Sequence, residues 1–156
     1  MTVKYCIQTS SQHGKGVFAR SAISAGERVL AFSGSRLHRS QVNFEDYHLQ
    51  VEADFYIGPS GAADDFVNHS CQPNCGFQAG LNLVALRAIA ADEELTWDYS
   101  TAIDEEAYPG FACSCGASLC RGKVQSFRDL PPEIQARLRP WLLPYLTAKY
   151  FPRPAD

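Results

Sequence analysis

Three cysteines stand close together late in this chain, as Cys113, Cys115 and Cys120. Where nothing in a sequence indicates secretion, thiols clustered in this way more often bind a metal than form disulfides. A structural zinc site takes four tetrahedral ligands, so three thiolates leave one position to be filled from elsewhere. The cluster therefore predicts a fold in which a distant part of the chain returns to meet residues 113–120. Buried or redox-active thiols are the alternative interpretation.

The segment around Asn68 and His69 holds the best candidates for the missing ligand. Cys71 and Cys75 both lie there, and spacing alone does not choose between them; Cys6 and the histidines are more remote candidates. Asn68 and His69 add side chains that donate and accept hydrogen bonds. So many polar and metal-binding groups in one short stretch predict a functional site rather than a plain loop.

Composition bounds the class of protein. The 156 residues suffice for one domain with a single core, and 46% hydrophobic with 20% charged residues is ordinary for a globular protein. No apolar run approaches the roughly 18 residues that span a bilayer, and we recognise no signal peptide. We therefore expect a cytoplasmic or nuclear protein with reduced thiols. A net charge of −3 argues against nucleic-acid binding through a broad basic surface and suits a basic partner.

Short segments rich in β-forming residues and punctuated by glycine predict a mainly β fold with minor α structure. Gly14 and Gly16 flank Lys15, where a hairpin turn is favoured over a ligand-binding loop, although glycine lets a backbone approach a ligand closely. Residues 35–46 are polar, so we expect them to be irregular or briefly helical. The expected strands are residues 3–7, 17–19, 28–32, 47–51, 55–58, 82–89 and 94–99.

The end of the chain differs, because its apolar residues recur at helical spacing. Pro131 and Pro132 mark a helix start, and Pro140 and Pro144 are expected to divide the segment into two short helices. We expect these helices to pack on the core, with a dimer interface as the alternative. The apolar stripe consists of Ile134, Leu138, Trp141, Leu142, Tyr145 and Leu146.

Four motifs, in order, resemble those of the SET-domain protein-lysine N-methyltransferases that carry a post-SET zinc motif. Residues 14–17 resemble the family's Gly-x-Gly cofactor loop, and residues 66–74 resemble its Asn-His-Ser-Cys-x-Pro-Asn signature. Residues 92–99 resemble its Glu-Glu-Leu-Thr-x-Asp-Tyr segment, and residues 113–122 resemble the post-SET motif. The first motif alone is weak, but the four together are specific.

The resemblance implies the SET-domain β-clip fold, in which a C-terminal segment is threaded into a pseudoknot. It implies a SET domain at residues 1–109, a post-SET zinc motif at 110–124 and a C-terminal helical extension at 125–156. It also implies one structural zinc ion, for which Cys71 joins the three later thiols. Oligomeric state is left as a monomer or a dimer through the C-terminal helices.

The resemblance further implies transfer of a methyl group from S-adenosylmethionine to a lysine side chain. Tyr99 takes the position of the family's catalytic tyrosine, and Tyr47 and Trp97 are expected to line the lysine channel. The expected partner is a protein that presents a lysine in a basic segment, with histones as candidates; neither nucleic acid nor membrane is expected. The positions that resemble cofactor-binding residues are Lys15, Gly16, Val17, Asn68 and His69.

Two departures from the family pattern keep an alternative open. Ser35 stands where the family often has an acidic residue after an aromatic-x-Gly sequence. Trp97 stands where the family usually has Phe or Tyr, a position that governs how many methyl groups are added. The alternative function is a catalytically weak SET-like module that binds other proteins.

Overall fold

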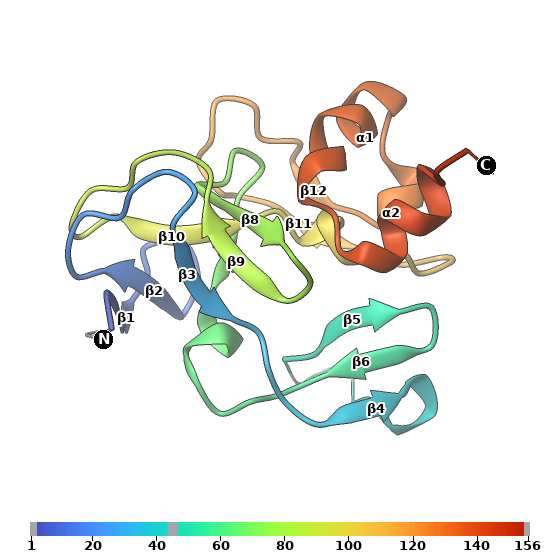
Figure 1. Ribbon diagram of the computed structural model, residues 1–156, viewed down its shortest axis with the longest axis horizontal. Coiled ribbons are helices and arrows are strands. Elements are labelled where there is room, and N and C mark those ends of the chain that lie inside the picture. Colours follow the sequence, from blue (N-terminus) through green and yellow to red (C-terminus); the bar gives the residue numbers. More distant parts are fainter. Residues whose placement is uncertain (1–2, 44–46, 155–156) are drawn as a thin grey trace.

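A computed structural model describes residues 3–43 and 47–154 (Figure 1). The described residues form short strands arranged in small sheets, with two short α-helices near the C-terminus. The prediction of a mainly β fold with few helices is confirmed. No helix within residues 3–43 and 47–154 is long and apolar enough to cross a membrane.

One sheet brings together three of the motifs found in the sequence. Its order is β1-β2-β10-β7, comprising Tyr5–Thr9, Lys15–Ala19, Glu94–Trp97 and Asn68–His69. Strand β10 is antiparallel to β2 and parallel to β7, so Thr96 lies opposite Asn68 in the pairing. Two segments far apart in the chain are thereby placed side by side.

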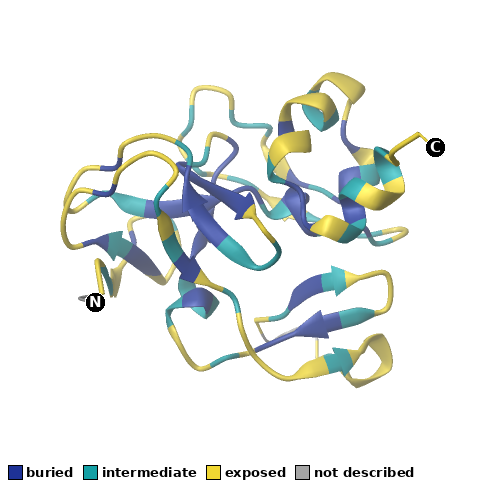
Figure 2. Cartoon of the chain, in the orientation of Figure 1, coloured by how far each residue is buried: buried dark blue, intermediate teal, exposed yellow. Residues whose placement is uncertain are grey.

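A second sheet, of order β3-β9-β8, carries much of the hydrophobic core. The strands are Arg28–Ala31, Asn82–Ala85 and Cys75–Gln78. Phe77 and Leu83 are almost completely buried, and Figure 2 shows the centre of this sheet as buried. Strand β9 is shorter than the predicted 82–89, and β8 has no counterpart among the strands predicted from the sequence.

The third sheet corrects one prediction. Its order is β4-β6-β5, comprising Arg36–His38, Phe55–Ile57 and Leu49–Glu52. Residues 35–46 were expected to be irregular or briefly helical, yet they begin with strand β4 before the short 3-10 helix η1 at Arg39–Gln41. Pairing with β6 and the Arg36 guanidinium, 4.0 Å from the Phe55 ring centroid, stabilise β4. Residues 44–46 lie outside the described residues.

The remaining short elements connect these sheets to the C-terminal part. Strands β11, Phe111–Ala112, and β12, Lys123–Val124, form a two-stranded sheet around the cysteine-rich loop. Short 3-10 helices precede β7 and follow β10. They are η2 at Ala63–Phe66 and η3 at Tyr99–Thr101.

Residues 125–154, called here the C-terminal segment, form the predicted pair of short helices. It holds the 3-10 helices η4, Phe127–Asp129, and η5, Arg139–Trp141, and the α-helices α1, Pro132–Leu138, and α2, Pro144–Tyr150. The prolines begin the α-helices, as predicted. The segment has a hydrophobic cluster of its own, made of Phe127, Leu130, Leu138, Leu142 and Leu146.

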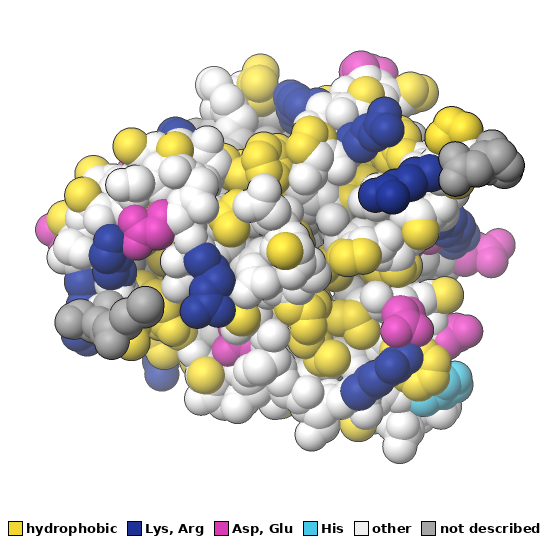
Figure 3. Space-filling model, in the orientation of Figure 1, with side chains coloured by type: hydrophobic (Ala, Val, Ile, Leu, Met, Phe, Trp, Pro, Cys, Tyr) yellow, Lys and Arg dark blue, Asp and Glu magenta, His cyan; other side chains and the backbone are white. Residues whose placement is uncertain are grey.

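The molecular surface carries charges of both signs. On the face shown in Figure 3, Lys and Arg side chains lie among acidic and uncharged ones, and hydrophobic side chains gather over the middle of the molecule. This distribution accords with the small net charge of −3.

Candidate active site and metal centre

Two cavities meet at Tyr99. The larger is a cleft of about 480 Å³, lined by the β1–β2 turn, strand β7, strand β11 and the loop that follows it. The smaller has a volume of about 120 Å³ and is lined largely by apolar side chains, among them Val67 and Trp97. Tyr47, Asp65 and Tyr99 line both cavities, so the two adjoin at these residues.

Tyr99 is held in place by two hydrogen bonds. Its hydroxyl donates to the Val67 carbonyl oxygen at 2.9 Å, and its backbone N–H donates to His69 Nδ1 at 3.1 Å. The Trp97 ring packs on it, with 4.7 Å between ring centroids. Burial raises the pKa of Tyr99 above its usual value of 10, so the hydroxyl stays protonated at neutral pH. Its oxygen lone pairs therefore remain available to accept a hydrogen bond.

Asn68 has its side-chain orientation fixed by three acceptors. Its Nδ2 group lies 2.7 Å from Glu94 Oε1, 3.0 Å from the Lys15 carbonyl oxygen and 3.4 Å from that of His13. The Asn68 Oδ1 atom has no hydrogen-bond partner among the described residues, which leaves an acceptor on a residue that lines the cleft. The same Glu94 carboxylate explains why residue 16 is glycine, because a Cβ there would collide with it.

His69 connects Tyr99 to the thiol cluster. Its Nδ1 accepts from the Tyr99 backbone, so its Nε2–H is the donor to Cys71 Sγ at 3.3 Å. Burial lowers the pKa of His69 to about 4, although the nearby Asp98 carboxylate acts in the opposite direction. The ring is therefore neutral at pH 7, as its accepting Nδ1 requires.

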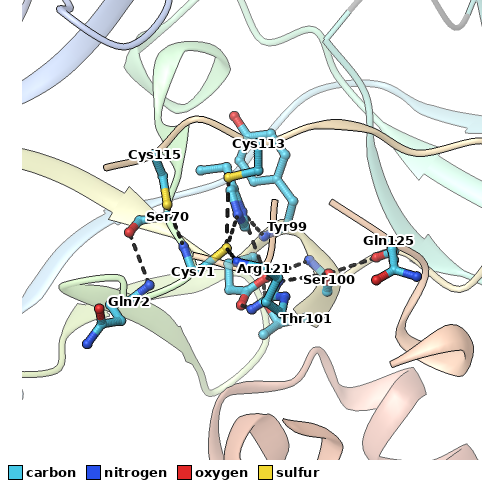
Figure 4. A network of polar contacts seen from close by, with 12 residues as sticks. Ser70, Cys71, Gln72, Tyr99, Ser100, Thr101, Cys113, Cys115, Arg121 and Gln125 are labelled. Carbon is cyan, nitrogen blue, oxygen red and sulfur yellow. Dashed lines mark hydrogen bonds and ion pairs between the residues drawn. The ribbon is translucent and has the colours of Figure 1, made fainter. Parts of the chain in front are cut away.

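The structure brings four thiols together. The Sγ atoms of Cys71, Cys113, Cys115 and Cys120 all lie within 4.8 Å of one another. Cys113 Sγ lies 3.8 Å from Cys71 Sγ and 3.7 Å from Cys120 Sγ. Figure 4 shows the sulfurs of Cys71, Cys113 and Cys115 turned toward a common point. Zinc–sulfur bonds of about 2.3 Å in a tetrahedron place sulfurs about 3.8 Å apart. The thiol cluster therefore fits a zinc ion.

The other two cysteines lie outside this cluster. Cys75 is completely buried in β8, where burial raises the pKa of its thiol to about 12. Cys6 lies in β1, half-buried, with Sγ 3.1 Å from the Gln8 amide nitrogen. Of the candidates that spacing left open, Cys71 is the one placed beside Cys113, Cys115 and Cys120.

A buried ion pair beside the thiol cluster was not predicted from the sequence. The Arg121 guanidinium donates two hydrogen bonds to the Asp98 carboxylate, at 2.7 and 2.8 Å, and the Arg121 backbone N–H donates to Cys71 Sγ at 3.4 Å. Asp98 is 1% exposed and directly precedes Tyr99. The pair thus joins the thiol cluster to the segment that carries Tyr99 (Figure 4). In the sequence Asp98 lies within motif residues 92–99 and Arg121 within motif residues 113–122, but nothing there predicts that the two side chains pair.

The remaining predicted site residues are divided between the cavities and the core. Lys15 lines the cleft, whereas Val17 is completely buried in the core and neither Val17 nor Gly16 lines either cavity. Tyr47 is 59% exposed and lines both cavities. Trp97 is buried in the wall of the smaller cavity, and its Nε1 has no hydrogen-bond partner among the residues that the structure describes.

The cleft and the adjoining smaller cavity suit a transferase, in which donor and acceptor molecules must meet at one point. A family model described as the SET domain matches residues 14–100, and the chain belongs to this family. The human histone-lysine N-methyltransferase 2B is 36% identical over 135 residues, covering 74% of this chain and 5% of the relative. The H3 lysine-4 specific histone-lysine N-methyltransferase of Saccharomyces cerevisiae is 29% identical over 133 residues. The match covers 72% of this chain and 12% of that relative. The chain therefore spans a small part of these relatives.

Solved structures agree on the fold. The crystal structure of KRYPTONITE in complex with mCHH DNA, H3(1-15) peptide and SAH has a TM-score of 0.63 and 26% identity, and covers 80% of this chain and 30% of that one. The methyltransferase domain of human histone-lysine N-methyltransferase SETMAR has a TM-score of 0.67 at 22% identity. The match covers 81% of this chain and 59% of that domain's chain. The predicted SET-domain fold is confirmed.

Proposed function

We propose that this chain transfers a methyl group from S-adenosylmethionine to the side-chain amine of a lysine in a protein. The observation that carries the proposal is the meeting of the cleft and the smaller cavity at Tyr99. A solved relative described as a complex with SAH and an H3 peptide supports both the cofactor and the type of substrate. Histones are the candidate substrate, and a basic peptide suits the mildly acidic chain.

The cleft provides the groups that would hold the cofactor. When bound, S-adenosylmethionine supplies a methyl group on a sulfonium, which is electrophilic. Asn68 Oδ1 is a free acceptor for the amino end of such a molecule, and Lys15 and His69 line the same cleft. Gly16 and Val17 contribute through the backbone of β2, whose neighbouring Lys15 carbonyl orients the Asn68 amide.

The smaller cavity, called here the lysine channel, would receive the lysine side chain. Only the neutral amine is a nucleophile, and an apolar wall disfavours the ammonium form of lysine. Trp97 and Tyr99 supply that wall, and their ring faces attract a partly positive methyl group. The Tyr99 hydroxyl already donates to Val67, so its oxygen accepts a hydrogen bond from the amine and orients it. Tyr47 borders both cavities and would hold the lysine where it enters.

We propose one structural zinc ion, bound by the four thiols of the cluster. Cys71 lies three residues after Asn68, so the metal would fasten residues 110–124 over the cofactor cleft, whose wall includes Cys113 and Cys115. We further propose the division into a SET domain at 1–109, a post-SET motif at 110–124 and a C-terminal extension at 125–156. The parallel pairing of β7 with β10 supports threading of the family's pseudoknot.

The relatives support a proposal for the compartment, and the packing of the C-terminal helices supports one for the oligomeric state. Those named histone-lysine N-methyltransferases support a nuclear or other intracellular site of action, where the thiols stay reduced. Trp141 packs against Gly76 and the Tyr145 hydroxyl bonds to the Ala102 carbonyl, so both side chains pack within their own chain. This packing supports a monomer over a dimer through the C-terminal helices.

One assay separates an enzyme from the alternative, a catalytically weak interaction module. The purified protein is incubated with labelled S-adenosylmethionine and a mixture of histones and other basic proteins, and cofactor binding is measured by calorimetry. An enzyme binds the cofactor and labels a protein. Absence of both label and cofactor binding supports the interaction module.

Methyl transfer is expected to speed up as the pH rises from 7 toward 10. The lysine amine, with an ordinary pKa near 10.4, loses its proton over this range. The pKa of Tyr99 is raised by burial, so its hydroxyl stays protonated throughout and causes no loss of activity. Initial rates at saturating cofactor and peptide, measured where the melting temperature is constant, check this expectation. A rate that decreases between pH 7 and pH 9 while the protein stays folded contradicts this expectation.

Asn68→Ala is expected to weaken S-adenosylmethionine binding about 10- to 100-fold. Removing a hydrogen bond to a charged group costs about 1.5–3 kcal/mol, which corresponds to this range. Calorimetric titration of the cofactor measures the effect. Asn82→Ala in β9 is the matched control, because its side chain bonds to the Ala79 carbonyl away from the cleft. Equal affinities for the two variants would remove Asn68 from the cofactor site.

A further inference from the structure

The C-terminal segment forms hydrogen bonds to the backbone of residues 101–104, which follow Tyr99 closely in the chain. Four successive carbonyl oxygens, of residues 101–104, each accept a hydrogen bond from it. Such a run of contacts to one short strip of backbone holds that strip in a defined position. The donors are Leu143 N to Thr101 O at 3.1 Å, the Tyr145 hydroxyl to Ala102 O, Phe127 N to Ile103 O at 2.7 Å and Arg128 Nη2 to Asp104 O at 3.4 Å.

Asp104 joins the C-terminal segment to the wall of the smaller cavity. Its carboxylate accepts from Lys149 Nζ at 2.6 Å, from the Tyr150 hydroxyl at 2.6 Å and from Arg128 Nε at 3.1 Å. Its backbone N–H donates to Gln50 Oε1 at 2.8 Å. Asp104 is only 7% exposed, so its carboxylate is buried even though Lys149 reaches it from the surface.

The strip held in this way forms part of the cavity that would receive the lysine. Ala102, Ile103 and Gln50 all line the smaller cavity, whereas no residue after Ile103 does. The larger cleft is likewise lined by no residue beyond Cys115. The C-terminal segment therefore touches the channel wall from behind and does not border the cofactor cleft.

The Lys149 contact is separate from the packing that folds the segment, because Lys149 belongs to neither hydrophobic cluster. The segment has its own hydrophobic cluster, which includes Phe127, Leu138 and Leu146. Lys149 is exposed on the outer side of α2, with its side chain 49% exposed. Loss of its charge leaves the hydrophobic cluster intact, so the segment is expected to stay folded without it.

We propose that the C-terminal segment positions the lysine channel, and that Asp104 is the positioning residue through which it acts. The proposal rests on the proposed function, because the channel is defined by the lysine it receives. The family model ends at residue 100, so nothing in the family match assigns this role to residues 125–154.

Lys149→Met tests this, since it removes one ion pair with Asp104 and keeps a long apolar side chain. Three measurements are compared: kcat with a histone peptide at saturating cofactor, the calorimetric Kd for S-adenosylmethionine, and the exchange rate of the Asp104 backbone amide hydrogen. We expect kcat to fall about tenfold, the Kd to stay within about twofold, and the amide to exchange about tenfold faster. The proportions of mono-, di- and trimethylated product are expected to shift, because the channel wall loosens.

Two further variants make the result specific. Lys149→Arg keeps the charge and is expected to restore kcat and slow amide exchange. Lys4→Met is the matched control, because Lys4 also makes a 2.6 Å ion pair, with Glu27, but lies in the N-terminal part away from the channel. It is expected to behave as the wild type in all three measurements.

The outcomes separate this proposal from the proposed function. If Lys149→Met leaves the Asp104 amide exchange and kcat as they are in Lys4→Met, the positioning role is overturned. Failure of Lys149→Arg to restore either value also overturns it. If the wild type transfers no methyl to any histone, the proposed function fails. Faster exchange in Lys149→Met alone would then still establish that the segment holds the wall of the smaller cavity.

Discussion

Tyr99→Phe is expected to lower kcat for methyl transfer about 100-fold while the protein stays folded and still binds S-adenosylmethionine. The hydroxyl lies where the cleft and the channel meet, and Val67 fixes its proton so that its oxygen can accept from the amine. Loss of that contact leaves the amine misplaced, and misplacement by about 1 Å can reduce a rate about 100-fold. Single-turnover kinetics with a histone peptide measure the effect directly.

The same substitution has a small expected effect on stability. The Val67 carbonyl loses its partner, which costs about 1–2 kcal/mol and lowers the melting temperature by a few degrees. Tyr5→Phe in β1 is the matched control, because Tyr5 lines neither cavity. A Tyr99→Phe enzyme with wild-type kcat would show that the hydroxyl does not orient the amine.

Cys71→Ser is expected to abolish zinc binding and to lower the melting temperature by about 10 °C or more. Structural zinc contributes several kcal/mol of folding free energy, and each kcal/mol corresponds to about 2–4 °C in a chain of this size. His69 and the Arg121 backbone also bond to this sulfur, so the effect reaches the cleft. Atomic emission spectroscopy and thermal unfolding measure metal content and stability.

Two comparisons sharpen the zinc experiment. Cys6→Ser removes a thiol outside the cluster and is expected to keep its zinc and its melting temperature. A strong chelator is expected to reproduce the Cys71→Ser result in the wild type, with loss of both stability and activity. An unchanged melting temperature and unchanged activity after chelation would contradict a metal that fastens residues 110–124 over the cleft. If Tyr99→Phe and Cys71→Ser fail in the same way, the distinction between catalytic and structural residues is wrong.

The motifs and the proline positions account for most of the correct predictions from the sequence. Thiol spacing demanded a distant fourth ligand, and the fold places Cys71 beside the other three because β7 pairs with β10. Pro140 and Pro144 interrupt helical hydrogen bonding, so the two-helix ending follows from local chemistry. The family resemblance supplied the fold and the role proposed for Tyr99.

Features that depend on tertiary contacts were missed. Strand β8 contains Gly76, a poor strand former, but Trp141 from the C-terminal segment occupies the space where a side chain would lie. Strand β4 is short and polar and owes its conformation to β6. Glu94 and Arg121 lie within motif segments, but their contacts could not be predicted, because each acquires its role from a partner far away in the chain.

Strand β7 consists of two residues, and this shortness sets a strict limit on changes in chain length. Neighbouring residues of a strand point to opposite faces, so Asn68 turns to Lys15 and Glu94 while His69 turns to Tyr99. A slip of one residue in the pairing with β10 would exchange these two directions. With no third residue to restore the pattern, a single-residue deletion between His69 and Cys71 would misdirect the Asn68 amide and the Cys71 sulfur together. Insertions in homologous chains should therefore fall in surface turns and spare this segment.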